Sequence, residues 1–326
     1  MGRLEGKPVK RAFAWIGIVP VLAIFLQLPD SKGQVEITPR PPKAGGSLSL
    51  PGANLRVDTN LVLVPATVND QFNHPITGLE KENFRIFDDK VEQTITSFLN
   101  EDEPIALGFI FDTSGSMQGL LPQGRAAAAE LLRFADPQDE FFLIEFDTRP
   151  RLVIPLTSNS IPIGLEVMNT KTEGSTAMFD AIFMGIHEMR KSRKGKKALV
   201  LISDGGDNHS RYTPDEVNTV VKESDVLIYT VAIGAGHDAD STFGLGRMRK
   251  ISELSGAHMF EEGPSGLQET AQKIAIELRN RYVIGYAPKE MARDGRYHKI
   301  QLRLSPPRGL PKLFAHWRTG YYAPTN

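Results

Sequence analysis

Between residues 105 and 280, short apolar runs alternate with longer amphipathic stretches. The apolar runs lack the polar alternation that a half-exposed strand would show, and the stretches between them have helical periodicity. Strands that are apolar on both faces and separated by helices form a mostly parallel sheet that helices cover on both sides. The pattern predicts a doubly wound α/β domain over residues 101–280. Its expected strands are 105–111, 140–147, 151–156, 196–203, 225–234 and 258–260, and its expected helices are 119–135, 175–192, 213–224, 243–256 and 266–280.

Strands and turns flank this domain on both sides. Residues 56–100 contain a β-rich run and then a predicted hairpin with strands at 84–87 and 91–98. Residues 281–326 contain a strand at 297–305 in which apolar and polar side chains alternate. Because the ends of a doubly wound domain often lie close together, we expect the two flanking segments to pair into one small β-sandwich module.

The N-terminal segment, residues 1–29, has the pattern of an export signal. Basic residues precede an apolar run, Ala12–Leu28, which would be ~25 Å long as a helix. That length leaves three alternatives: a cleaved signal peptide, an uncleaved membrane anchor, or a buried helix. The first two place the rest of the chain in the periplasm, the cell envelope or the extracellular space. Residues 30–55 are rich in proline, glycine and serine, which predicts a flexible linker.

Composition excludes several classes of partner and functional site. The 326 residues carry a formal net charge of -1, and a basic run at 190–197 follows a predicted helix. Nucleic acid is therefore not expected as a partner. The chain has no cysteine, which excludes disulfides, zinc–thiolate sites, iron–sulfur clusters and a cysteine nucleophile.

A cluster of small oxygen-bearing side chains follows the first predicted strand of the α/β domain. Asp112, Ser114 and Ser116 lie in one tight loop, where Gly115 allows a sharp turn. Ligands of open parallel sheets bind outside the carboxyl ends of the strands. One carboxylate and two hydroxyls are hard donors that suit Mg²⁺ or Mn²⁺ rather than zinc or copper.

Two further loops at the same edge of the sheet supply matching donors. Thr176 lies at the start of a predicted helix, after Gly174, and Asp204 follows the predicted strand 196–203. Three loops therefore offer Asp, Ser, Ser, Thr and Asp in chain order.

In these residues the sequence resembles the von Willebrand factor type A domain over about Pro104–Asn280. Asp112, Ser114, Ser116, Thr176 and Asp204 match the family's metal-ion-dependent adhesion site. The resemblance implies that the two serines bind the metal directly. It implies that the threonine and the aspartates bind it directly or through water. The expected metal is Mg²⁺, with Mn²⁺ and Ca²⁺ as alternatives.

Two details accompany the resemblance. Ser203 stands where the family often has threonine. The flanking β segments and the closing "RTGYY" also resemble a group of bacterial, especially acidobacterial, exported proteins built around this domain. In some relatives the last helix of the domain shifts when the metal captures a ligand. Here that helix, 266–280, leads directly into the C-terminal β segment.

The expected function is adhesion-type binding of a protein partner that presents an Asp or Glu carboxylate to the metal, without enzymatic activity. One alternative is a metal-dependent hydrolase, with Asp204, Asp207 and His209 as a ligand cluster. Another is a structural subunit of an envelope complex that does not capture a ligand through metal. The sequence contains no HExxH, GxSxG, phosphate-loop or GxGxxG motif. It does not specify the partner or the oligomeric state.

Overall fold

The computed structural model describes residues 61–99, 103–234, 239–262, 266–288 and 293–325. The predicted N-terminal export segment and the predicted linker, residues 1–29 and 30–55, lie outside these ranges. Among the described residues, no helix combines the length and the apolar character that crossing a bilayer requires.

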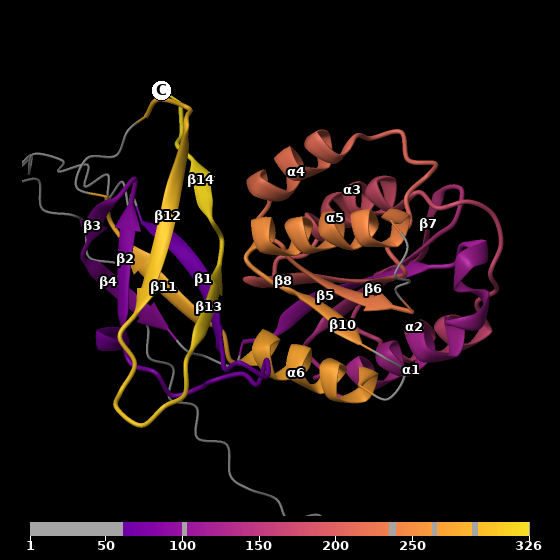
Figure 1. Ribbon diagram of the computed structural model, residues 1–326, viewed down its shortest axis with the longest axis horizontal. Coiled ribbons are helices and arrows are strands. Elements are labelled where there is room, and N and C mark those ends of the chain that lie inside the picture. Colours follow the sequence, from indigo (N-terminus) through magenta and orange to yellow (C-terminus); the bar gives the residue numbers. More distant parts are fainter. Residues whose placement is uncertain (1–60, 100–102, 235–238, 263–265, 289–292, 326) are drawn as a thin grey trace, which may run out of the picture. The chain divides into compact units, whose positions relative to one another are not determined.

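A six-stranded sheet forms the centre of the α/β domain (Figure 1). Its strands lie in the order β10-β9-β8-β5-β6-β7. All neighbouring strands are parallel except β7, which runs antiparallel to β6 at one edge. The prediction of a doubly wound, mostly parallel sheet is confirmed. The strands are β5 (Ile105–Asp112), β6 (Glu140–Phe146), β7 (Pro150–Thr157), β8 (Lys196–Ser203), β9 (Leu227–Ile233) and β10 (Met259–Glu262).

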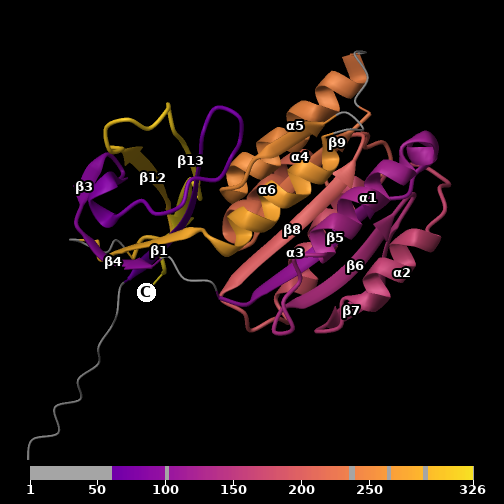
Figure 2. The same ribbon diagram turned by 90° about the horizontal axis from the view of Figure 1, so that it is seen from below.

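Helices cover both faces of this sheet (Figure 2). Successive side chains of β5 alternate between two cores: Phe109 packs into one and Ile110 into the other. The Phe109 core is closed by α1 (Leu121–Leu132), α2 (Ile161–Asn169) and α6 (Leu267–Arg279). The Ile110 core is closed by α3 (Met178–Met189), α4 (Pro214–Glu223) and α5 (Ala239–Ser255).

The sequence pattern did not predict α2. Only Ile163 and Val167 of this helix are buried, while Ile161, Leu165 and Met168 are exposed. Apolar residues therefore occupy both its inner and its outer face, so the stretch has no clear apolar stripe. Without that contrast, periodicity does not separate a helix from other structures.

The segments on either side of the α/β domain form two four-stranded sheets, in the orders β13-β1-β11-β4 and β14-β12-β2-β3. Each sheet takes strands from both segments, so the predicted pairing into a β module is confirmed. The domain boundaries at 56, 101 and 281 stay predictions. The strands are β1 (Val62–Asn69), β2 (Phe84–Asp88), β3 (Val91–Gln93), β4 (Ile95–Leu99), β11 (Tyr282–Tyr286), β12 (Tyr297–Leu304), β13 (Phe314–Trp317) and β14 (Gly320–Tyr322).

One strand expected in the β module is divided in two. Residues 91–98 were expected to form a single strand, but the chain leaves the strand conformation at Thr94. On one side of Thr94, β3 pairs with β2, and on the other side β4 pairs with β11 in the second sheet. No glycine or proline marks the break, so the change of sheet leaves no clear signal in the local sequence. Side chains from both sheets share one core, which includes Val64, Ile86 and Tyr282.

Candidate metal-binding site

The first loop of the candidate site follows β5. Asp112 ends this strand, and the short 3-10 helix Gly115–Gly119 begins just after it. Asp112 and Ser114 are buried, whereas Ser116 is exposed. The Ser114 amide donates to Asp112 Oδ1 over 2.9 Å, and the hydroxyls of Ser114 and Ser116 lie 3.1 Å apart. This local bonding holds the three predicted donors of the loop together.

Ser203 holds the other oxygen of Asp112. β8 lies beside β5, and the Ser203 hydroxyl at its end donates to Asp112 Oδ2 over 2.5 Å. The same hydroxyl accepts a hydrogen bond of 3.1 Å from the Gly205 amide. In the sequence, Ser203 was noted only as a departure from the family pattern and was assigned no function. The available signal was its position at the end of a strand that neighbours β5.

The electrostatics of Asp112 fit a place next to a cation. Burial raises the pKa of Asp112 to about 6. Hydrogen bonds from Ser114 and Ser203 oppose this rise, and the nearby charge of Asp204 adds to it. A buried carboxylate with its pKa raised in this way gains from a positive ion within a few ångströms. Both oxygens already accept hydrogen bonds from protein groups, which suits a carboxylate that reaches a metal through water.

The second loop joins the first and the third. Gly174, with a φ of 76°, uses its carbonyl to accept a 3.1 Å hydrogen bond from the Gly115 amide. Thr176 is buried, and its amide donates to Asn208 Oδ1 over 2.9 Å. The Thr176 carbonyl accepts from the amides of Asn208 and His209 over 3.0 and 2.9 Å. The three loops are therefore tied to one another through their backbones.

A cavity of about 460 Å³ lies where these loops meet, and Ser116, Thr176 and Asp204 all line it. A Cβ atom placed on Gly206 would lie 3.4 Å from Asp204 Oδ1 and 3.7 Å from Thr176 Oγ1. The two oxygens therefore border the same space. Of the five predicted donors, three line the cavity, Ser114 contacts one of these three, and Asp112 is buried next to Ser114. Hydroxyl and carboxylate oxygens are the donors that a hard divalent cation takes in proteins.

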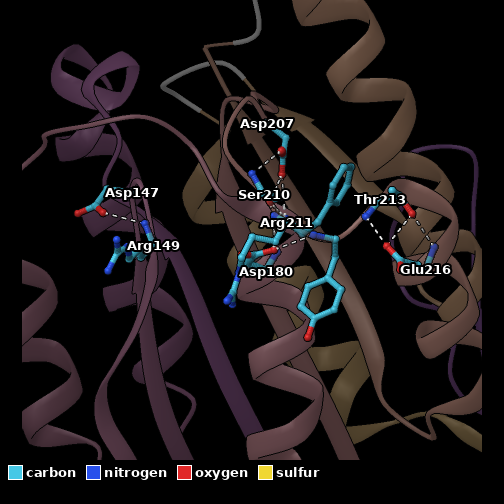
Figure 3. Close-up of polar contacts among 10 residues, drawn as sticks. Asp147, Arg149, Asp180, Asp207, Ser210, Arg211, Thr213 and Glu216 are labelled. Carbon is cyan, nitrogen blue, oxygen red and sulfur yellow. Dashed lines mark hydrogen bonds and ion pairs between the residues drawn. The ribbon is translucent and has the colours of Figure 1, made fainter.

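The third loop is anchored to the start of α3 (Figure 3). Asp207 Oδ2 accepts hydrogen bonds from the Ser210 hydroxyl over 2.6 Å and from the Phe179 amide over 2.9 Å. Buried Asp180 accepts from the backbone amides of Arg211 and Tyr212. The Asp207 carboxylate thus holds the loop to a helix N-terminus, which argues against the His209 ligand cluster considered from the sequence.

The rim of the cavity carries an aromatic and a basic side chain from α5. The Arg247 guanidinium lies 4.2 Å from the centroid of the Phe243 ring, which is 64% exposed. Both residues also line a neighbouring cavity of about 600 Å³, together with Phe179, Pro214 and Ile251. Positive charge and apolar surface therefore lie beside the oxygen donors.

Comparison with known families identifies the class of protein. A sequence profile of the von Willebrand factor type A domain matches residues 107–272, about half of the chain. The chain belongs to this family, and the resemblance seen in its sequence is confirmed. The acidobacterial subgroup stays a prediction.

Individual relatives are distant. Uncharacterized protein sll0103 of Synechocystis sp. is 25% identical over 54% of this chain and 42% of its own length. Inter alpha-trypsin inhibitor, heavy chain 4, of Mus musculus is 24% identical over 49% of this chain and 18% of its own. The chain thus spans less than half the length of these curated relatives.

Solved structures similar to the chain include a von Willebrand factor type A protein from Catenulispora acidiphila. It is 13% identical, covers 80% of this chain and 72% of its own, and has a TM-score of 0.48. The vWF domain of the type V pili tip protein Mfa5 from Porphyromonas gingivalis is also 13% identical. It covers 55% of this chain and 95% of its own, with a TM-score of 0.44.

Proposed function

We propose that this chain is an exported protein-binding module of the adhesion type. In this proposal Asp112, Ser114, Ser116, Thr176 and Asp204 hold one Mg²⁺, for which Mn²⁺ or Ca²⁺ can substitute. When bound, the cation supplies a coordination position for an Asp or Glu carboxylate of a partner protein. The neutral hydroxyl ligands leave the ion much of its positive charge, which favours an anionic partner.

The observation that carries the proposal is the convergence of three loops on one cavity. Ser116, Thr176 and Asp204 come from loops far apart in the sequence and line the same space. The Asp112 carboxylate is held behind them by Ser114 and Ser203. Such a site positions a cation and orients its ligands without a nucleophile–base pair, so we propose binding rather than catalysis.

The direct test is isothermal titration calorimetry with Mg²⁺ on the purified chain and on single variants. Wild type should bind one equivalent. Asp112→Ala and Ser116→Ala should each weaken binding by at least about ten-fold, because they remove a donor or its orientation. Asp215→Ala is the matched control, since Asp215 is an exposed carboxylate in the first turn of α4, outside the cavity. Equal Mg²⁺ affinity in wild type and Asp112→Ala would overturn the site.

Partner binding is tested separately, by a pull-down from cell-envelope extract in Mg²⁺ and in chelator. We expect a captured protein whose retention requires Mg²⁺ and is lost in Ser116→Ala. Capture that persists in chelator would favour a structural subunit that uses no metal. Turnover of ester or phosphate substrates by the pure protein, abolished in Asp112→Ala, would favour the hydrolase instead.

A further inference from the structure

Two aspartates and a histidine meet in the β module, outside the α/β domain. Asp88 is the last residue of β2, and Asp89 begins the turn to β3. His298 lies in β12, the antiparallel neighbour of β2. The Asp89 amide donates to the Lys299 carbonyl and the Lys299 amide donates to Asp89 Oδ1, each over 2.9 Å. These paired bonds hold the turn against β12.

One oxygen or nitrogen of each side chain points to a common region. Asp88, Asp89 and His298 each offer one ligand atom, and these three atoms lie within 4.8 Å of one another. His298 Nδ1 is 3.0 Å from Asp89 Oδ2 and 3.8 Å from Asp88 Oδ1. Ligands bound at about 2.0–2.1 Å to a tetrahedral zinc ion are ~3.3 Å apart. The two distances from His298 Nδ1 lie on either side of that value.

Asp88 supplies an independent observation. Asp88 is only 7% exposed, and its Oδ1 is buried without a hydrogen-bond partner. Its Oδ2, in contrast, accepts from the hydroxyls of Tyr286 and Tyr321 over 2.9 and 3.0 Å. A buried carboxylate oxygen without a partner is costly. This one is directed at the region that it shares with Asp89 and His298.

The surroundings of His298 match those of a metal-binding imidazole. Its second ring nitrogen, Nε2, lies 3.3 Å from Asp294 Oδ1. Metal-binding imidazoles typically donate their second ring N–H to a carboxylate or carbonyl, and Asp294 occupies that position beside Nε2. The ring also stacks on Tyr321, with centroids 5.4 Å apart. Its orientation is therefore set from two sides.

We propose that Asp88, Asp89 and His298 bind a divalent transition-metal ion, with Zn²⁺ as the best match. The imidazole nitrogen distinguishes this ligand set from the all-oxygen set of the α/β domain and favours Zn²⁺ or Co²⁺ over Mg²⁺. The ion links the β2–β3 turn to β12, so binding stabilises the β module. The competing explanation is a protonated His298 that pairs with the surrounding carboxylates and binds no metal.

The test is calorimetric titration of Zn²⁺ into the tag-free full-length chain, with excess Mg²⁺ to fill the oxygen site. Co²⁺ serves as a second probe, because tetrahedral coordination gives it visible absorption. Wild type should bind one equivalent of Zn²⁺ and show a higher thermal midpoint with it. His298→Ala and Asp88→Asn should weaken Zn²⁺ binding at least about ten-fold. Asp88→Asn retains an oxygen that can accept from the two tyrosines.

His74→Ala is the matched control. His74 also lies near two carboxylates, at 3.0 Å from Asp70 and 3.7 Å from Glu269, but its side chain is 54% exposed. This variant should bind Zn²⁺ as wild type does. If His298→Ala fails to fold, Asp294→Asn provides the test, with binding weakened about ten-fold. No Zn²⁺ binding by wild type, or wild-type affinity in Asp88→Asn, would overturn the proposal.

Discussion

The side-chain amide of Asn69 donates a 2.7 Å hydrogen bond to Oε1 of Glu277. Asn69 ends β1 of the β module, and Glu277 lies near the end of α6, so the bond joins the flanking module to the last helix of the α/β domain. Both side chains are buried, and His258 Nε2 lies 3.5 Å from the same oxygen. Burial raises the pKa of Glu277 to about 8, against the effect of the Asn69 bond, and lowers the pKa of His258 to about 3.

From the pKa values of Glu277 and His258 we predict that the free energy of unfolding falls as the pH rises from about 6.5 to about 8. Because the pKa of Glu277 is higher in the folded state, the folded chain binds more protons there, and raising the pH favours unfolding. The slope should reach up to about 1.4 kcal/mol per pH unit. His258 acts in the opposite direction, but only between about 3 and 6.5. Urea unfolding at several pH values measures the slope.

Glu277→Gln is the variant that isolates this effect. Its amide oxygen can still accept from Asn69, and it does not titrate, so the free energy of unfolding should become nearly independent of pH in the same window. Glu253→Gln, at an exposed position of α5, should retain the wild-type slope. An unchanged slope in Glu277→Gln would show that another group is responsible.

Ser203 should control Mg²⁺ affinity without being a ligand itself. Ser203→Ala removes the hydroxyl that holds Asp112 Oδ2, and we expect about ten-fold weaker Mg²⁺ binding and a loss of about 1–3 kcal/mol in stability. Ser203→Thr keeps the hydroxyl and should bind Mg²⁺ nearly as wild type does.

A buried serine elsewhere in the domain separates the effect of Ser203→Ala on Mg²⁺ affinity from its effect on stability. Ser252 is fully buried and its hydroxyl lies 2.9 Å from that of Thr230, outside the loops of the proposed metal site. Ser252→Ala should lower stability but leave Mg²⁺ affinity unchanged. If both alanine variants lowered Mg²⁺ affinity equally in calorimetry, a specific role for Ser203 would be excluded.

Gly108 should not accept a larger side chain. It lies in the middle of β5, and a Cβ atom there would be 2.2 Å from Phe142 Cζ and 2.6 Å from Leu199 Cδ2. Gly108→Ala should therefore cost about 1–3 kcal/mol of stability through overpacking. Gly246→Ala, at an open position in α5, should stabilise the chain by about 0.5–1 kcal/mol. Chemical denaturation of both variants checks this contrast, and equal effects would contradict it.

Substitution of Asp139 should lower the stability of the chain more than substitution of an exposed charged residue. It is fully buried, accepts the Ile105 amide over 2.9 Å, and pairs with Arg279 at the end of α6 over 2.5 Å. Asp139→Ala removes the acceptor of the buried Ile105 amide and the carboxylate that pairs with Arg279, and should cost about 3–5 kcal/mol. The pair Arg85–Glu92 is a similarly close contact at 2.7 Å but is exposed, so Glu92→Ala should change the thermal midpoint very little. Comparable losses in the two variants would be inconsistent with burial as the cause.

Much of the architecture follows from local pattern. β5 is apolar at both odd and even positions, and this pattern is enough to predict a strand covered on both faces. The first three candidate ligands lie within five residues of one another, so their proximity is a property of the loop itself. Thr176 and Asp204 could be added because each stands at an element end that a parallel sheet brings to the same edge.

Contacts between distant segments could not be predicted in this way. Ser203 meets Asp112 across 91 positions in the chain, and Asn69 meets Glu277 across 208. The proposed Zn²⁺ ligands also become neighbours only because β2 pairs with β12. Periodicity and turn residues are features of the local sequence. They were enough to predict the fold class and the candidate loops. The choice of strand partners, the break at Thr94 and the buried polar contacts depend on how whole segments pack, so only the tertiary structure decided them.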